Sequence, residues 1–271
     1  MNILSLGAGV QSSALLLMAL RGETEPIDGV IFADTGWEPQ SVYRQADFLE
    51  GQCAAAGVAF WRVSAGNIRD AAVRSALPSD TPGLTPPERF ASMPLHLATP
   101  KGRGMLRRQC TSDFKITPIR RKLRELGATA KKPVTIWIGI SLDEAHRMRD
   151  SAVKYIVNAY PLIERRMTRH DCLRWLEDKG YDRPPKSACI GCPFKDNTRW
   201  REMKLTEPDE WRDAVKFDSE IRSLSRIDGA VFLHRSLVPL SEVDLSTAAD
   251  KGQTEMFGDS FGNECEGLCG V

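Results

Sequence analysis

The feature that most constrains the fold is a glycine-rich turn between an apolar run and a helix-forming run. The apolar run Asn2–Leu6 is typical of a buried parallel strand, and Val10–Leu20 is rich in helix-forming residues. The turn and the first helical residues read GAGVQSS. They lack the Gly-Lys-Ser/Thr ending of a P-loop, and Ser12 stands where a dinucleotide fingerprint has glycine. We therefore predict a phosphate-binding turn of another kind, in which Gly7 and Gly9 let backbone N–H groups converge on an anion.

Strands and helices continue to alternate after this turn. GVIFADTGWEP predicts a second strand with Asp34 at its carboxyl end, GVAFWRVSA a third, and KPVTIWIGIS a further one. Such alternation implies right-handed crossovers, so we predict an α/β fold with a doubly wound parallel sheet of Rossmann-like type. Ligands of such sheets bind at the carboxyl ends of the strands, where Asp34 lies. Helices are expected over 41–56, 112–126, 168–179, 197–204 and 208–223.

The chain is expected to fall into three consecutive stretches. Its 271 residues are enough for one large α/β domain with an appendage. Residues 77–104 carry six prolines and three glycines, which is typical of a lid or an irregular insertion. The predicted stretches are a nucleotide-binding α/β domain with that insertion, a helical metal-binding part, and a mobile acidic tail, over 1–160, 161–240 and 241–271 respectively.

Charge is balanced overall but unevenly distributed. The net charge is +1, which points to no particular class of partner. Residues 101–132 hold eleven Lys or Arg against two acids, whereas 241–271 hold seven acids against one Lys. The basic segment either receives a polyanionic substrate, attracts the acidic tail, or is simply a set of solvated helix faces.

The chain has no run of 18 or more apolar residues and no basic, signal-like start. We therefore expect a cytoplasmic protein with no membrane partner. Its seven cysteines, an odd number, favour metal ligation or redox chemistry over a disulfide framework in a reducing compartment.

Four segments in order carry a resemblance to a known family. LSLGAGVQSS, FADTGWEP, RRQCTSDFKITPIRRKL and GISLDEAHRMR resemble the motifs of the phosphoadenosine phosphosulfate (PAPS) reductase family, in the adenine nucleotide α-hydrolase-like (PP-loop) superfamily. ATP pyrophosphatases of that superfamily usually carry Asp where Gln11 stands, which favours sulfonucleotide binding over ATP cleavage. The resemblance implies a nucleotide site made of Ser5, Gly7, Gly9, Gln11, Ser12, Asp34, Thr35, Gly36, Lys115 and Arg147. Sulfate would be held by basic residues of the same motifs, which are Arg107, Arg108, Lys115, Arg147 and Arg149.

A cysteine pair in SACIGCPF adds a metal site. Cys189 and Cys192 stand two residues apart, and such a pair alone is a redox dithiol or half of a zinc site. Cys110 falls where iron–sulfur members of the family place a cluster cysteine, although they have two adjacent cysteines there. Cys172 is the candidate fourth ligand; otherwise it is a small buried hydrophobic residue. The resemblance favours a [4Fe–4S] cluster, with zinc as the alternative.

The end of the chain, FGNECEGLCGV, resembles the segment that carries the nucleophilic cysteine of sulfonucleotide reductases. Cys265 or Cys269 is the expected nucleophile, because a mobile thiolate can attack a sulfonate sulfur and then leave for reduction. Alternatively, one of the two resolves the other as a disulfide, or both are incidental thiols.

Two enzymatic functions follow from these observations. The first is a PAPS or adenosine phosphosulfate (APS) reductase, an oxidoreductase of sulfur metabolism that uses a thioredoxin-like reductant. The second is ATP-dependent sulfur insertion into nucleic acid, of the DNA phosphorothioation or tRNA thiolation type, with Mg²⁺ if ATP is the substrate. A nucleotide-binding regulator with a structural metal is a third, non-enzymatic reading.

Overall fold

The computed structural model describes residues 1–76, 93–224, 228–247 and 250, and these divide into two compact units. The first unit combines Met1–Ala65 with Thr111–Ala188, and the second combines Gly66–Cys110 with the described residues from Cys189 onward. Each unit is thus assembled from separate stretches of the chain. This differs from the three consecutive stretches predicted from the sequence, because both units recruit segments from both halves of the chain.

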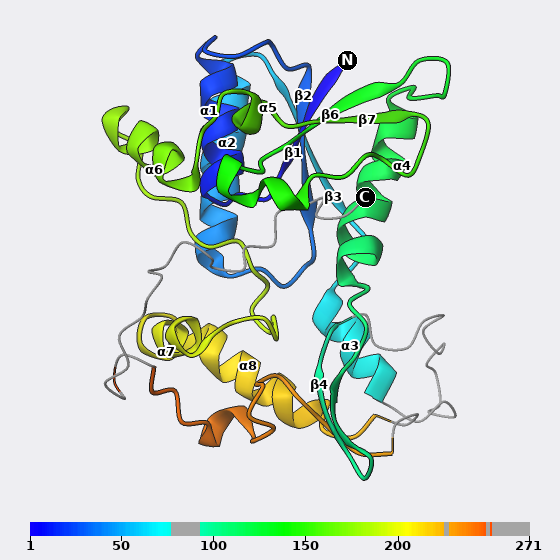
Figure 1. Cartoon of the computed structure of the whole chain (residues 1–271), viewed down its shortest axis with the longest axis vertical. Helices are drawn as coiled ribbons and strands as arrows, with labels where there is room; N and C mark the ends of the chain where they lie inside the picture. Colours follow the sequence, from blue (N-terminus) through cyan, green and yellow to red (C-terminus); the bar gives the residue numbers. More distant parts are fainter. Residues whose placement is uncertain (77–92, 225–227, 248–249, 251–271) are drawn as a thin grey trace. The chain divides into compact units, whose positions relative to one another are not determined.

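The first unit is built on a five-stranded parallel sheet with the strand order β3-β2-β1-β6-β7 (Figure 1). The order reverses between β1 and β6, because the chain adds β2 and β3 on one side of β1 and β6 and β7 on the other. The predicted doubly wound α/β fold is confirmed. The strands are β1 (Asn2–Leu6), β2 (Gly29–Asp34), β3 (Ala59–Ser64), β6 (Val134–Ile138) and β7 (Ile156–Ala159).

Helices cover both faces of this sheet (Figure 1). On one face α1, α2 and α6 pack on Leu4 and Leu6, and on the other α4 packs on Ile3. Neighbouring residues of β1 therefore enter different cores, as the two-residue period of a strand requires. The helical segments of this unit are α1 (Val10–Leu20), α2 (Gln40–Ala55), a π-helix (Thr111–Ile116), α4 (Thr117–Glu125), the 3₁₀ helix η2 (Leu142–Arg147), α5 (Pro161–Glu164) and α6 (Arg169–Asp178).

The second unit contains a small antiparallel sheet in the order β5-β4-β8. Its hairpin, β4 (His96–Thr99) and β5 (Gly102–Met105), lies almost entirely in the stretch 77–104 that was predicted to be irregular, so that expectation was wrong for 96–104. The cause is long-range pairing, since β4 also pairs with β8 (Ala230–Phe232), which no local pattern reveals. Residues 77–92, the rest of the predicted lid, lie outside the described residues. The remaining elements are α3 (Ile68–Ala76), α7 (Asn197–Thr206), α8 (Pro208–Glu220) and the 3₁₀ helix η3 (Leu240–Glu242).

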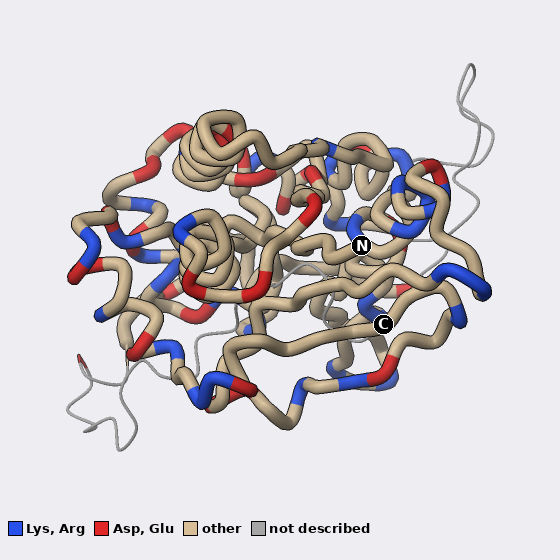
Figure 2. Tube along the Cα trace, turned by 90° about the horizontal axis from the view of Figure 1, so that it is seen from above, with Lys and Arg blue, Asp and Glu red and all other residues tan. Residues whose placement is uncertain are grey.

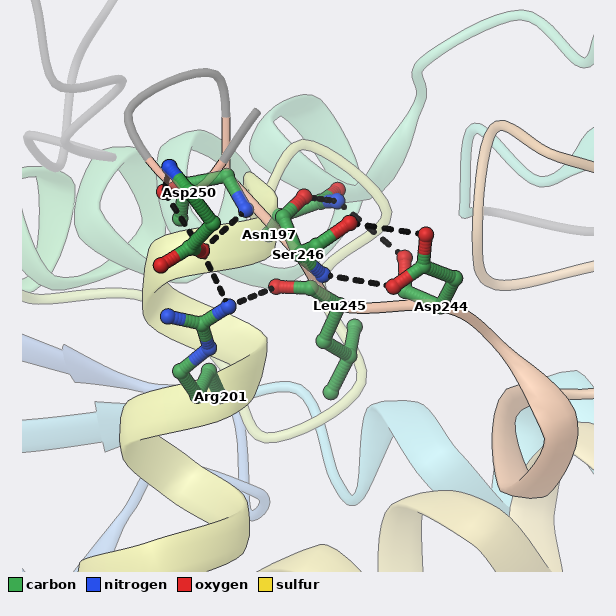
Figure 3. A network of polar contacts seen from close by, with 7 residues as sticks. Asn197, Arg201, Asp244, Leu245, Ser246 and Asp250 are labelled. Atoms are coloured by element: carbon green, nitrogen blue, oxygen red, sulfur yellow. Dashed lines mark hydrogen bonds and ion pairs between the residues drawn. The ribbon is translucent and has the colours of Figure 1, made fainter. Parts of the chain in front are cut away.

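The first part of the predicted tail is fastened to α7 (Figure 3). Asn197 Nδ2 donates to the carbonyl oxygens of Asp244 (3.3 Å) and Ser246 (2.8 Å). Arg201 donates to the carbonyl of Leu245 at 2.9 Å and forms an ion pair with Asp250. Residues 244–247 are therefore anchored within the second unit. Residues 251–271, including Cys265 and Cys269, lie outside the described residues.

Charged residues of both signs lie close together at many points along the trace (Figure 2). In the basic segment, Lys122 forms an ion pair with Glu125 at 3.3 Å, and Lys115 lies 3.9 Å from Glu38. The basic segment is thus partly neutralised by acids of the first unit. None of the helices in the described part of the chain is both long enough and apolar enough to cross a membrane.

Candidate functional site

The turn between β1 and α1 contains a residue in the left-handed region of backbone conformation. Ala8 has φ 58°, in the left-handed region, and Gly9 returns to extended backbone at the start of α1. The Gly7 N–H donates to Ser12 Oγ (3.3 Å), and the Ser13 N–H donates to the Gly9 carbonyl (3.0 Å). A left-handed residue other than glycine costs on the order of 1 kcal/mol and is usually retained where the backbone has a task. Here the left-handed residue is Ala8, which lies between the two glycines of the turn.

The end of β6 is pressed against this loop. A Cβ atom added to Gly139 would lie 2.8 Å from the backbone nitrogen of Ser12 and 2.9 Å from its Cα. Real Cβ atoms do not approach backbone this closely, so only glycine fits without moving the loop. The loop thus lies where the carboxyl ends of β1 and β6 meet, which is the point at which the strand order reverses.

Gln11 joins the loop to the segment after β6. Its side chain is 1% exposed, and its Nε2 donates to Ser141 Oγ (3.4 Å) and to a carboxylate oxygen of Glu144 (3.0 Å). Glu144 in turn forms an ion pair with Arg147. The predicted site residues Gln11 and Arg147 are therefore brought into one chain of contacts through Glu144. The arrangement adds a neutral amide beside the loop, where a carboxylate at position 11 would add a negative charge.

The carboxyl end of β2 supplies the second side of the site. Asp34 Oδ1 accepts from the Gly36 N–H (2.7 Å) and from the Tyr43 hydroxyl (2.9 Å), and Gly36 has φ 71°. Burial raises the pKa of Tyr43, as do the neighbouring carboxylates of Asp34 and Glu38, so its hydroxyl stays protonated and donates. The corner after β2 is consequently fixed by Asp34.

A buried ion pair lies beyond this corner. Glu38 is 4% exposed and Lys115 is 5% exposed, and Lys115 Nζ lies 3.9 Å from Glu38 Oε1. The same carboxylate oxygen accepts from the Thr35 hydroxyl at 2.9 Å. Lys115, predicted to contact phosphate or sulfate, thus has an internal carboxylate beside it. It is located on the π-helix Thr111–Ile116, a rare conformation that often occurs at functional sites.

Ser5 and three of the predicted sulfate-binding arginines are not part of the contacts described so far. Ser5 lies within β1, paired in register with Ile31 and Ile138, and its hydroxyl has no hydrogen-bond partner among the described residues. Arg149 donates to the carbonyl oxygens of His146 and Met148 next to it in sequence. Arg107 and Arg108 belong to the second unit.

Three residues of the first-unit site were not predicted from the sequence: Glu38, Tyr43 and Ser141. Glu38 follows the predicted strand end within DTGWEP, and Ser141 ends the predicted strand KPVTIWIGIS, so both stood beside quoted motifs. Tyr43 gave no such signal, because it reaches Asp34 from the first turn of α2.

The cysteine pair forms a tight turn in the second unit. The Cys192 N–H donates to the Cys189 carbonyl at 3.1 Å, and Lys195 Nζ donates to the carbonyl oxygens of Cys189 and, at 3.0 Å, Ile190. Lys195 is 7% exposed, and its ammonium also lies 5.2 Å from the Trp200 ring centroid. A buried ammonium thus holds the turn through its carbonyl groups.

Cys110 belongs to the same unit as this turn. Two residues before it, Arg108 lies over the ring of Phe194, with its guanidinium carbon 5.5 Å from the ring centroid. Three half-buried thiols in one unit are a donor set suited to a thiolate-bound metal. Within the described ranges, however, no three His, Cys, Asp or Glu side chains are gathered closely enough to hold a metal ion.

Cys172 does not belong to the same unit as these thiols. It belongs to the first unit, is fully buried, and packs in the hydrophobic core formed with α1 and α2. This is the environment of a small buried hydrophobic residue, the alternative considered from the sequence. The proposed nucleophiles Cys265 and Cys269 lie outside the described residues.

Comparison with known proteins finds likeness only among solved structures. No family model and no curated protein matches the chain. One structural neighbour is phosphoadenylyl-sulfate (PAPS) reductase from Candida auris, with 13% identity and a TM-score of 0.39, over 68% of this chain and 74% of that one. Another is the U34-tRNA thiolase NcsA from Methanococcus maripaludis with its [4Fe–4S] cluster, with 13% identity and a TM-score of 0.37, over 89% of this chain and 78% of that one. The likeness concerns the α/β fold and indicates neither substrate nor reaction.

Proposed function

We propose that this protein is a sulfonucleotide reductase of the PAPS or APS type, which binds its adenine nucleotide at the loop between β1 and α1. The observation that carries the proposal is the loop itself: a left-handed turn at Ala8, closed against Gly139 at the point where the strand order reverses. Such a turn offers N–H donors to a polyanion. Gln11 keeps the adjoining position neutral, and Arg147 balances the charge of Glu144.

The proposed reaction uses a tail thiol. The thiolate of Cys265 or Cys269 attacks the sulfonate sulfur, an S–S bond forms, and the sulfur–oxygen bond to the nucleotide phosphate breaks with the electron pair leaving on the phosphate. A second thiol, from the chain or from a thioredoxin-like dithiol, then attacks the cysteine sulfur and releases sulfite. The two thiols are oxidised to a disulfide and the sulfonate is reduced to sulfite, so the electrons balance.

Cys110, Cys189 and Cys192 are the residues we propose for an iron–sulfur cluster, which would supply a cationic iron centre able to bind sulfur. Their thiol chemistry and their common unit support this assignment. Cys172, in the hydrophobic core, we assign to packing. Anaerobic purification of single Cys→Ala variants tests the division: substitution of Cys189 or Cys192 should remove bound iron, whereas substitution of Cys172 should retain it. Loss of iron from the Cys172 variant alone would reverse the assignment, and a colourless zinc protein would remove the cluster.

The function is tested by comparing substrates on the full chain. Incubation with PAPS or APS and a dithiol should release sulfite, and incubation with ATP should give no AMP and pyrophosphate. A double variant with Cys265→Ser and Cys269→Ser should release no sulfite, while Cys53→Ala, which changes a buried thiol of α2, is the matched control. Turnover of ATP without sulfite release would instead indicate sulfur insertion into nucleic acid.

A further inference from the structure

A cavity in the first unit lies outside the loop described above. It has a volume of about 630 Å³ and is lined by residues of α1, α2, the end of α6 and the chain after α6. This volume lies within the range of small-molecule sites. Gln45 lines the cavity, and its Nε2 donates to Ser13 Oγ (3.3 Å) in the first turn of α1, so the cavity begins beside the loop but extends along the helices.

One wall of this cavity is aromatic and firmly held. Phe48 and Tyr181 both line it and pack edge to face, with ring centroids 6.2 Å apart. Tyr181 also stacks on Trp175 at 6.1 Å and 21°, and the indole N–H of Trp175 donates to Glu23 at 2.8 Å. Phe48 remains 41% exposed. A large exposed ring beside a fixed tyrosine offers a flat ligand a surface for stacking.

Positively charged side chains also line this cavity. Arg44 and Arg183 both border it, are exposed, and have no ion-pair partner among the described residues. Asp182 also lines it, so these three residues contribute a net charge of +1. Arg62 of the same unit, by contrast, forms an ion pair with Asp47. Two arginines left to solvent in one cavity favour an anionic ligand.

A buried polar atom completes the lining. Ser41 borders the cavity, and its Oγ is buried with no hydrogen-bond partner among the described residues. A buried hydroxyl without a partner is costly, so a ligand or a water molecule is expected to satisfy it. Stacking surface, arginine charge and a spare hydroxyl are therefore presented together.

We propose that this cavity is a second nucleotide site, in which a nucleobase stacks on Phe48 and Tyr181 and its phosphate pairs with Arg44 and Arg183. Every base has a π-face, so the site would be tolerant of base identity. The ligand is a free nucleotide or a nucleotide within a single strand, since both present a base and a phosphate. The proposal does not depend on the ligand of the β1–α1 loop, because none of the residues it uses is part of that loop.

Fluorescence anisotropy of labelled hexathymidylate with the full chain tests the proposal, with thymidine monophosphate as competitor. Phe48→Ser should weaken binding about 10-fold, through loss of stacking. The double variant Arg44→Gln with Arg183→Gln should weaken it by a similar factor and lower the slope of log affinity against log salt by about one to two.

Matched controls distinguish this site from general surface binding. Leu205→Ser removes an apolar side chain that is 73% exposed, and Arg174→Gln removes a cation of α6 that is 65% exposed; both should leave binding unchanged. If thymidine monophosphate competes at a concentration similar to that of the hexathymidylate, the site binds free nucleotides. If it fails to compete, the site binds single strands. Unchanged binding in the Phe48 and arginine variants, or no binding of either probe, would overturn the proposal.

Discussion

The loop after β1 and the cysteine turn are held in place by opposite means. The loop depends on residues far away in sequence, because Gln11 bonds to Ser141 and Glu144, and Gly139 lies against Ser12. The cysteine turn depends on a residue of its own segment, since Lys195 holds the carbonyl oxygens of Cys189 and Ile190. The loop therefore requires the assembled sheet, whereas the turn requires one buried ammonium.

The largest effect is expected from a substitution that disrupts the long-range contact between the loop and the end of β6. Gly139→Val places a side chain against the backbone of Ser12, which cannot move without moving the loop. We expect the unfolding free energy to fall by about 3 kcal/mol, the upper range for overpacking. Adenine nucleotide affinity should fall at least about 100-fold, because the N–H donors would lose their common direction. Urea unfolding and calorimetric titration with AMP measure the two effects.

Gly51→Ala is the matched control for this substitution. Gly51 lies within α2, and a Cβ there would meet no atom within 4 Å. Replacing a helical glycine by alanine is expected to stabilise the protein by up to about 1 kcal/mol, with unchanged nucleotide affinity. If both variants bound AMP like the parent chain, the loop would not be the nucleotide site.

A smaller loss of stability is expected in the second unit when the pH is lowered. Burial is the main reason that the pKa of His234 is lowered to about 4, and the positive charges of Arg235 and His96 contribute to the same shift. The Ser236 N–H donates to Nδ1 at 3.2 Å, which requires that nitrogen to be unprotonated. Above the ordinary pKa of histidine the ring is neutral in both states, so no stability is lost. As the pH falls towards 4, only the unfolded chain takes up the proton, so the folded state loses stability.

This linkage amounts to about 2 kcal/mol between pH 7 and pH 5. Amide hydrogen exchange should therefore show α7 and α8 losing protection at pH 5 more than α1 and α2. His234 Nε2 lies 3.1 Å from Asn197 Oδ1, so the anchor of residues 244–247 should loosen with them. His234→Gln should flatten the pH dependence, and His170→Gln, at an exposed position of α6, should not. Equal loss of protection in both units would contradict the prediction.

The same contrast explains how much the sequence could predict. The β–α units of the first unit follow from local patterns, such as the apolar run Asn2–Leu6 before the glycine turn. The hairpin β4–β5 did not, since its pairing with β8 joins residues more than 100 positions apart in sequence. Strand pairing of that range leaves no periodic signal in either partner.

Within the candidate site, the backbone positions were predictable and the side-chain partners were not. The two glycines mark the loop in the sequence, but the residue that adopts the left-handed region is Ala8, whose type gives no signal of it. The buried pair of Glu38 and Lys115 arises from the approach of the π-helix to β2, which is a property of the packed sheet. Cys172 could not be assigned by spacing, because ligation and packing place the same residue type on a helix.

The smallest effect is expected from a substitution at the corner after β2, where Tyr43 bonds to Asp34. Tyr43→Phe removes the hydroxyl that donates to Asp34 Oδ1 at 2.9 Å and keeps the ring in place. Because the Gly36 N–H still donates to the same oxygen, Asp34 retains one partner, and the unfolding free energy should fall by only about 1 kcal/mol. Adenine nucleotide affinity should fall a few-fold if Asp34 must be held still to bind, which calorimetric titration with AMP measures. Tyr155→Phe is the control, since its ring packs under Arg124 away from this corner. An affinity loss as large as that of Gly139→Val would show that the β2 corner, and not the contact between the loop and β6, dominates nucleotide binding.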